Sequence, residues 1–257
     1  MREEYPKRFS NNLGREMECG VFRADTPSDI DRSKVCLAFP PQAGRHWDFR
    51  NFGMVEACRP WIESGQLFLI CVDGIDGETW AAEGDPRARI ELQEHWFHYV
   101  VDELVPEYCS NGEKAMTTGC SMGATHAANF FFRRPDLFDG MVALSGVYNA
   151  QVFFHEYCDN LVYDNSPIHF LPNMPLDHPW MKLYARSEII TCVGQGAWED
   201  ELLYSTRELD RIMTEKGIPH WSDYWGYDVN HDWPWWYKQM RYFLPFVLEH
   251  YRRGEKR

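Results

Sequence analysis

The sequence lacks the features that mark several common classes of protein. It has no run of about 18 apolar residues, the length that a membrane-spanning helix needs. Its N-terminal segment has no apolar core of the signal-peptide type. It has no Cys-x-x-Cys pair, so we expect no cysteine-rich zinc site. Positive charge is also scarce, because 26 Lys and Arg residues stand against 39 Asp and Glu residues, and the net charge is −13.

These absences limit the partners of the chain. A surface that binds nucleic acid needs clustered Lys and Arg side chains, and anionic membranes attract the same residues. We therefore expect neither nucleic acid nor a membrane as a partner, whereas a homo-oligomer stays open. Three of the eight cysteines, Cys36, Cys71 and Cys192, lie inside apolar runs, where Cys is typically a small buried hydrophobe. Reduced cysteines and the missing signal segment together predict a cytoplasmic protein.

The composition is that of a folded protein, since 44 % of the residues are hydrophobic and 16 % are aromatic. The length fits one α/β domain, and we expect a single domain over residues 1–257. Short apolar runs bounded by Gly, Pro or Asp are typical of strands that are covered on both faces. The expected strands are residues 34–39, 67–72, 114–119, 140–146 and 188–194, with an edge hairpin strand at 15–24 and a last strand at 220–225.

Segments with helical spacing of apolar residues lie between these strands. The alternation predicts an α/β fold, with a mostly parallel central sheet and helices on both of its faces. Residues 148–187 interrupt it, because they are rich in Pro, Asn, His and aromatic residues. We expect them to form a small insertion packed over one edge of the sheet. The expected helices are residues 54–64, 88–108, 122–134, 203–216 and 234–252.

Ser121 is the candidate nucleophile. It lies in the pattern Gly119-Cys120-Ser121-Met122-Gly123, between an expected strand and an expected helix, and in such sheets ligands bind at the carboxyl ends of the strands. A nucleophile on a sharp strand-to-helix turn needs small neighbours, because the backbone passes close to the adjoining elements. The helix N-terminus also faces the place where negative charge develops. The alternative is a structural serine in a tight turn.

A nucleophilic serine needs a base, and the base needs an acid that orients it. In this architecture the acid and then the histidine follow the serine along the chain. His231 lies after the last expected strand and before the last helix, which makes it the candidate base. The loop after strand 188–194 holds two acids, of which we prefer Asp200 and keep Glu199 as the alternative. Asp232 is expected to point away or to bond the loop backbone.

Acyl transfer also needs hydrogen-bond donors for the oxyanion. One donor should be the backbone N–H of Met122, the residue after the nucleophile. The other should come from the loop after the first buried strand. Pro40 and Pro41 of that loop have no N–H, so the donor must follow them, and Gln42 is preferred to Ala43.

These motifs resemble the α/β-hydrolase superfamily, and within it the esterase group of esterase D, enterochelin esterase and the antigen 85 mycolyltransferases. The segment DYWGYDVNHDWPWWYKQMRYFLP is similar to the His-Asp-Trp ending of that group. The segments FPPQAGRHWDFRNFGMVEA, FLICVDGIDGETW and VYDNSPIHFLPN resemble a bacterial subgroup of uncharacterised esterases. The resemblance covers about residues 30 to 248 and implies an α/β-hydrolase fold.

The resemblance also implies roles for single residues. It makes Ser121 the nucleophile and His231 the base, and Asp200 falls at the acid position. The chain departs from the group in two places. A Pro-Pro pair replaces the usual His-Gly of the oxyanion loop, and the acid loop is a few residues longer than usual, which leaves Glu199 open.

Other residues near these motifs have weaker assignments. Trp47, Trp198 and Trp233, together with Trp80, lie on or beside expected site loops and are candidates to bind an acyl or aryl group. Each tryptophan alone is more often a core residue. Cys120, beside the candidate nucleophile, is expected to point into the fold. His126, one turn into the expected helix after Ser121, is expected to have a packing role.

The sequence therefore predicts a serine carboxylesterase that hydrolyses a small or aromatic ester through an acyl-enzyme. Such a reaction needs no metal and no cofactor, and its partner is a small-molecule ester. Two alternatives stay open: an acyltransferase that uses the same three residues, and a non-catalytic binding protein on a hydrolase scaffold. The identity of the ester does not follow from the sequence.

Overall fold

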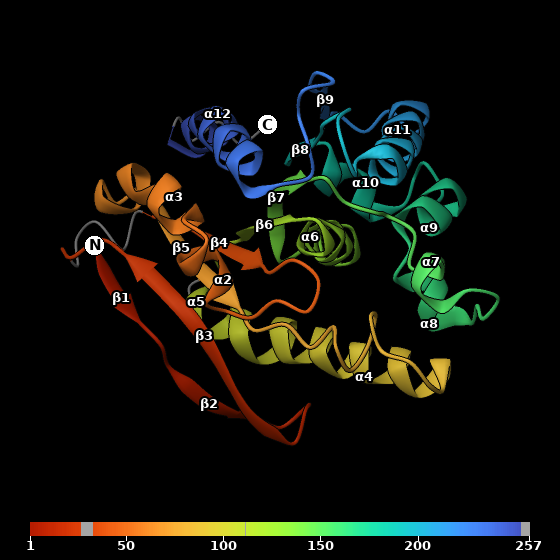
Figure 1. Ribbon diagram of the computed structural model, residues 1–257, viewed down its shortest axis with the longest axis horizontal. Coiled ribbons are helices and arrows are strands. Elements are labelled where there is room, and N and C mark those ends of the chain that lie inside the picture. Colours follow the sequence, from red (N-terminus) through yellow and green to blue (C-terminus); the bar gives the residue numbers. More distant parts are fainter. Residues whose placement is uncertain (27–32, 111, 253–257) are drawn as a thin grey trace.

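The computed structural model describes residues 1–26, 33–110 and 112–252. The strands are Arg2–Glu4 (β1), Lys7–Ser10 (β2), Arg15–Arg23 (β3), Lys34–Phe39 (β4), Leu67–Val72 (β5), Ala115–Cys120 (β6), Phe138–Leu144 (β7), Glu188–Val193 (β8) and Trp221–Tyr224 (β9). They form a sheet in the order β1-β3-β5-β4-β6-β7-β8-β9, with β2 also paired to β3 (Figure 1). Neighbouring strands from β5 to β9 are parallel. The prediction of a mostly parallel sheet is confirmed.

The N-terminal strands extend the sheet in the antiparallel sense. The prediction that residues 15–24 form an edge strand is wrong, because β3 pairs with β1 and β2 on one side and with β5 on the other. β1 and β2 have only three and four residues and carry mostly charged side chains. Such strands have no apolar run, which is why the sequence pattern did not indicate them.

Helices cover both faces of the sheet. They are Asp48–Asn51 (α2), Met54–Glu63 (α3), Pro86–His98 (α4), Val105–Tyr108 (α5), Met122–Arg133 (α6), Asp200–Glu215 (α11) and Trp233–Arg252 (α12), and a π-helical segment, Tyr99–Leu104 (η1), joins α4 to α5. Alternate residues of β4 point to opposite faces. Cys36 and Ala38 are buried with α3 and α12. Leu37 and Phe39 are buried with α4, α6 and α11. Across the described ranges, no helix is long and apolar enough to cross a membrane.

The insertion between β7 and β8 is helical. Its helices are Gln151–Phe154 (α7), Asn160–Asp164 (α8), Pro167–Asn173 (α9) and Pro179–Tyr184 (α10). It packs against other helices and not over an edge of the sheet as expected, since α9 contacts α6 and α11, and α8 contacts α4. A polar cluster holds it there. Glu94 of α4 accepts hydrogen bonds from Arg133 of α6 and from Asn165, which follows α8.

Candidate active site

Ser121 lies on a sharp turn between β6 and α6. Its backbone has φ +57° and ψ −126°, a conformation that non-glycine residues rarely adopt. The flanking glycines allow this turn. A Cβ on Gly119 would lie 2.2 Å from backbone atoms of Gly123, and a Cβ on Gly123 would lie 2.1 Å from the carbonyl oxygen of Phe39. The G-x-S-x-G pattern is therefore required by close backbone packing at the carboxyl end of the sheet.

The side chains of Ser121, His231 and Glu199 form a hydrogen-bonded row. His231 Nε2 lies 2.9 Å from Ser121 Oγ, and His231 Nδ1 lies 3.3 Å from Glu199 Oε2. With the ring proton on Nδ1, the histidine donates to the carboxylate and accepts from the hydroxyl. Glu199 is fully buried, whereas His231 is partly exposed. The row has the geometry of a nucleophile, a base and an orienting acid.

The acid in this row is Glu199 and not the preferred Asp200. Asp200 is the first residue of α11, which begins three residues earlier than expected, and its side chain is exposed. A carboxylate in the first turn of a helix is stabilised by the helix dipole and can remain in solvent. Glu199 directly precedes the helix and is directed into the protein. The structure thus corrects the preference between these two acids and brings the alternative to His231.

The loops that carry Glu199 and His231 are hydrogen-bonded to each other. The N–H of Gly196 donates to the carbonyl of Val229, and the N–H of His231 donates to the carbonyl of Ala197. The side chain of Asn230 accepts a hydrogen bond from the N–H of Ala197. The acid loop and the histidine loop therefore form one unit above β8 and β9, which sets the distance between the acid and the base.

The loop after β4 lies against the start of α6. Gln42 and Ala43 are exposed in a turn that the N–H of Gly44 closes by donating to the carbonyl of Pro41 at 2.8 Å. Met122, the first residue of α6, is buried. The first N–H groups of a helix have no partner within the helix, so the amide of Met122 is available to a ligand. This is the region in which sequence analysis expects the two oxyanion donors.

Asp73, just after β5, holds the loop after β4 in place. Its carboxylate accepts a bidentate pair of hydrogen bonds from Arg45 at 2.7 and 2.8 Å. It also accepts the backbone N–H of His46 and contacts the ring Nδ1 of that residue at 3.1 Å. Burial alone would raise the pKa of this carboxyl, but the hydrogen bonds from His46 and Arg45 outweigh it and lower the pKa. These hydrogen bonds fix the guanidinium of Arg45 against Asp73, a contact that the sequence pattern did not predict.

The comparisons with known proteins agree with this geometry. The sequence pattern of the family described as "Putative esterase" matches residues 42–246, most of the chain. The chain belongs to this family. The resemblance to the esterase group is thereby confirmed, and the activity class is that of a carboxylic ester hydrolase. No curated protein matches the sequence.

Solved structures show the fold of this esterase. A ferulic acid esterase superposes with a TM-score of 0.74 at 16 % identity, covering 97 % of this chain and 98 % of that one. The S-formylglutathione hydrolase of Agrobacterium tumefaciens superposes with a TM-score of 0.72 at 16 % identity, covering 96 % of this chain and 95 % of that one. The S-formylglutathione hydrolase of Staphylococcus aureus superposes with a TM-score of 0.68 at 14 % identity, with 96 % of each chain covered. Together with the family match, these similarities confirm the α/β-hydrolase fold.

The candidate substrate-binding tryptophans of the esterase differ in their surroundings. Trp198 is 84 % exposed and has φ +68°, an unusual conformation for a bulky residue, directly before Glu199. Trp47 is exposed, with the guanidinium of Arg45 4.9 Å from its ring centroid. Trp233 stacks on Phe52 with 5.1 Å between ring centroids. Trp80, by contrast, is a buried core residue, packed between His126 and the insertion.

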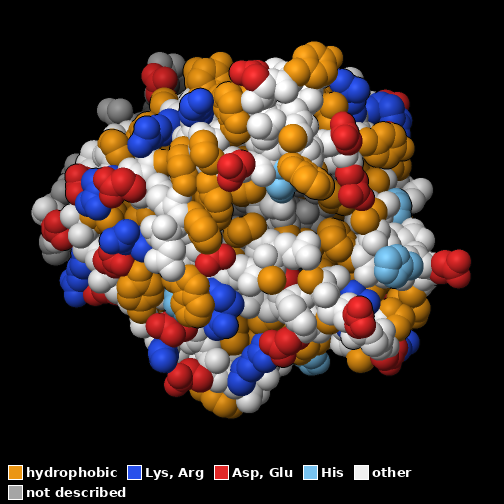
Figure 2. Space-filling view, viewed as in Figure 1, with side chains coloured by type: hydrophobic (Ala, Val, Ile, Leu, Met, Phe, Trp, Pro, Cys, Tyr) orange, Lys and Arg blue, Asp and Glu red, His pale blue; other side chains and the backbone are white. Residues whose placement is uncertain are grey.

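Figure 2 shows the surface above this region of the esterase. A hollow lies near the middle of the face, over α6 and beside α12, with a histidine side chain at its edge. Hydrophobic side chains gather on the α12 side of the hollow, whereas charged side chains lie mostly farther out. This face of the molecule therefore has a recess with apolar side chains on one side of it.

The neighbouring residues have the structural roles that were expected. Cys120 is fully buried, and burial raises the pKa of its thiol well above the ordinary value. His126 is buried between two tryptophans, and its Nε2 lies 2.7 Å from Asp76. The carboxylate of Asp232 accepts a hydrogen bond from the backbone N–H at the start of α12. These contacts do not involve the hydrogen-bonded row at Ser121.

Two residues that contact this row escaped sequence analysis. Ser145, directly after β7, donates a hydrogen bond to the second carboxylate oxygen of Glu199. Trp236, in the first turn of α12, lies with its ring perpendicular to that of His231 at 4.9 Å. A signal was present for Ser145, because it is the last residue but one of the expected strand 140–146, which is the next strand along the chain after the one that precedes Ser121. Nothing in the pattern distinguished it from an ordinary strand-end serine.

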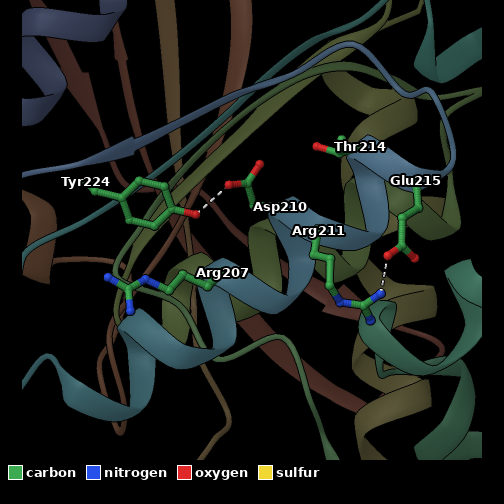
Figure 3. Close-up of a pocket in the computed structure, with 6 residues that line it drawn as sticks. All are labelled: Arg207, Asp210, Arg211, Thr214, Glu215 and Tyr224. Carbon is green, nitrogen blue, oxygen red and sulfur yellow. Dashed lines mark hydrogen bonds and ion pairs between the residues drawn. The ribbon is translucent and has the colours of Figure 1, made fainter.

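A surface pocket of about 480 Å³ lies elsewhere, between α11 and β9 (Figure 3). Three of its charged side chains are paired with one another or with near neighbours, and the guanidinium of Arg207 lies 5.8 Å from the ring centroid of Tyr224. Asp210 accepts a hydrogen bond from Tyr224 and contacts His220, and Arg211 pairs with Glu215. The lining is formed by Arg207, Asp210, Arg211, Thr214, Glu215 and Tyr224. None of the predicted site residues lines it, and His220 is thereby accounted for as a structural histidine.

Proposed function

We propose that this esterase is a serine hydrolase that forms an acyl-enzyme on Ser121, with His231 as the base and Glu199 as the orienting acid. The observation that carries the proposal is the hydrogen-bonded row from Ser121 Oγ through the imidazole to the carboxylate. A serine hydroxyl at its ordinary pKa is a poor nucleophile and needs an adjacent base. The buried Glu199 carboxylate supplies the negative charge that stabilises the imidazolium formed when His231 accepts the proton.

The reaction proceeds in two halves. Ser121 Oγ attacks the ester carbonyl carbon while its proton passes to His231 Nε2. The tetrahedral intermediate collapses as the alcohol oxygen leaves with that proton, and the acyl group stays on Ser121. Water then attacks the acyl-enzyme, gives a proton to His231 and releases the carboxylic acid, and the proton returns to Ser121. The 3.3 Å contact between His231 and Glu199 is expected to shorten when the imidazole is charged.

The negative oxygen of the intermediate needs donors that are already in place. We assign the backbone N–H of Met122 and that of Gln42 to this role. The position of Met122 at the start of a 12-residue helix favours negative charge there. The contact between Gly123 and the carbonyl oxygens of Phe39 and Pro40 supports Gln42, because it brings the loop after β4 close to the helix start.

The surroundings of the site favour a small or aromatic ester. Trp47, Trp198 and Trp233 are the proposed contacts, and aromatic side chains bind flat apolar groups by stacking and area burial. The exposed indole of Trp198, in its unusual backbone conformation next to the acid, is the most accessible of them. Ferulic acid esterases are among the structures that this chain resembles, which supports an aromatic acyl group.

A panel of p-nitrophenyl esters tests the proposal. Wild-type protein and Ser121→Ala are assayed with acyl groups of rising length and with aromatic acyl groups. We expect the variant to lose hydrolysis of every ester, since about 10³-fold or more of the rate depends on the nucleophile. Hydrolysis by Ser121→Ala at the wild-type rate would contradict the proposal. The acyl preference of the wild type measures the size of the binding region.

The same assay separates the alternative functions. If an added alcohol diverts the acyl group into a new ester and free acid becomes the minor product, the protein is an acyltransferase. If no ester is turned over and Ser121 reacts with no serine-directed reagent, it is a binding protein. We favour hydrolysis by a single domain. We also propose a cytoplasmic location, which the eight free cysteine thiols support.

A further inference from the structure

Ser145 contacts the carboxylate of Glu199 on the oxygen that His231 does not use. Its hydroxyl lies 2.7 Å from Oε1, while Oε2 faces the imidazole. Ser145 and Glu199 are both fully buried. A buried carboxylate is costly unless its oxygens accept hydrogen bonds. The imidazole can occupy one oxygen only, so the second oxygen depends on Ser145.

The backbone at Ser145 is in a conformation that favours glycine. Its φ is +57°, in the left-handed region, and its N–H donates to the carbonyl of Cys192 at 2.7 Å. That hydrogen bond continues the pairing of β7 with β8 and holds the residue where its side chain reaches Glu199. A serine therefore occupies a position where glycine would be less strained, and the gain is the hydroxyl.

Trp236 fixes the direction of that hydroxyl. Its indole Nε1 donates to Ser145 Oγ at 3.3 Å. Because the oxygen accepts from the indole, its own hydrogen is free to point to the carboxylate. The same indole ring lies perpendicular to the imidazole of His231, with 4.9 Å between the centroids. Trp236 thus contacts both partners of Glu199.

We propose that Ser145, oriented by Trp236, is a positioning residue that holds the Glu199 carboxylate in the plane needed by His231. This inference rests on the proposed function, because it concerns the same acid and base. Without the hydroxyl, Oε1 has lost its donor and the carboxylate is free to rotate. Rotation weakens its hold on the imidazole and lowers the rate of the step in which His231 takes the proton from Ser121.

The decisive variant is Ser145→Gly, since glycine removes the hydroxyl and accepts the positive φ without strain. We expect the protein to fold with an unchanged or higher Tm. We expect kcat to fall about tenfold, as for loss of one hydrogen bond to a charged group, with KM within about twofold of wild type. Because the contact acts through the base and not on the substrate, the loss should appear in kcat and not in KM.

A matched control is Ser205→Ala. Ser205 is also buried and accepts a hydrogen bond from the backbone N–H of Tyr148 at 2.7 Å. Loss of this hydroxyl should lower Tm and leave kcat within about twofold of wild type. Trp236→Phe keeps an aromatic ring beside His231 but removes the indole donor, and it should slow the wild type more than it slows the Ser145→Gly protein.

The outcomes are distinguishable. A Ser145→Gly protein with wild-type kcat would overturn the inference, as would a loss that appears in KM and not in kcat, or an effect of Trp236→Phe that is simply additive. These results would leave the proposed function standing, provided that Ser121→Ala is inactive. Full hydrolysis by Ser121→Ala would instead remove the proposed function itself.

Discussion

The carboxylate of Glu199 lies 3.3 Å from Nδ1 of His231, 32 residues along the chain, while the neighbouring Asp200 is exposed at the start of α11. One peptide bond separates two acids with opposite surroundings. The chain turns sharply at Trp198, whose φ is +68°, and then enters the helix. The last residue before the helix is directed inward and the first residue within it is directed outward.

The two acids give a matched pair of variants. Glu199→Gln should lower kcat by about 10³- to 10⁴-fold, because a neutral amide neither stabilises the imidazolium nor selects the required tautomer. Asp200→Asn should leave kcat within about twofold and cost only about 0.3–1 kcal/mol of stability through the helix dipole. Steady-state kinetics with one p-nitrophenyl ester measures both, and the reverse ranking would show that Asp200 is the acid.

Gly123 should tolerate no side chain. A Cβ there would meet the carbonyl oxygens of Phe39 and Pro40 at 2.1 and 2.7 Å, and backbone atoms yield only if β4 and its loop move. We expect Gly123→Ala to lose about 1–3 kcal/mol in urea unfolding and to lower kcat, since the oxyanion loop is displaced. Gly77→Ala is the control, because a Cβ at Gly77 meets no atom within 4 Å. Equal stability of the two variants would refute the packing argument.

Asp73→Asn should disturb the oxyanion loop and change the pH dependence of stability. The hydrogen bonds from His46 and Arg45 lower the pKa of Asp73 despite its burial. Such a carboxylate stabilises the fold above its unfolded pKa, about 3.9, and this contribution is lost as the pH falls through the lower folded pKa. The stability difference between wild type and variant should therefore be largest above about pH 5 and shrink below about pH 4. A difference that stays constant with pH would contradict this account.

The thiols should divide sharply in reactivity. Cys158 is exposed, whereas Cys120 is buried and burial raises its pKa well above the ordinary value. Iodoacetamide at pH 8 should modify Cys158, leave Cys120 intact and not affect hydrolysis, as shown by peptide mapping and a parallel assay. Alkylation of Cys120 in the folded protein would mean that the residue beside the nucleophile is accessible after all.

The sequence predicted those parts of the fold that repeat a strong local pattern. The expected strands at 34–39 and 67–72 agree with β4 and β5 residue for residue, because buried parallel strands are continuous apolar runs. β1 and β2 carry no such run. The single expected helix 88–108 is α4, a π-helical turn and α5, a change of hydrogen bonding that apolar spacing does not reveal.

Prediction of the site depended on how far each residue is fixed by its own neighbours. Ser121 is marked by its glycines, and His231 by its place between the last strand and the last helix. The choice between Glu199 and Asp200 depended on where α11 begins, and helix ends are poorly defined by sequence patterns. Ser145 was missed because its role depends on a contact across 54 residues of chain.

Covalent labelling of Ser121 tests the central claim most directly. Wild-type protein is treated with a fluorophosphonate probe, digested and analysed by mass spectrometry, with Ser121→Ala treated in parallel. A single adduct on Ser121 in the wild type, no adduct in the variant and loss of ester hydrolysis in step with labelling are the predicted results. An unlabelled Ser121 in protein that still hydrolyses esters would contradict the account.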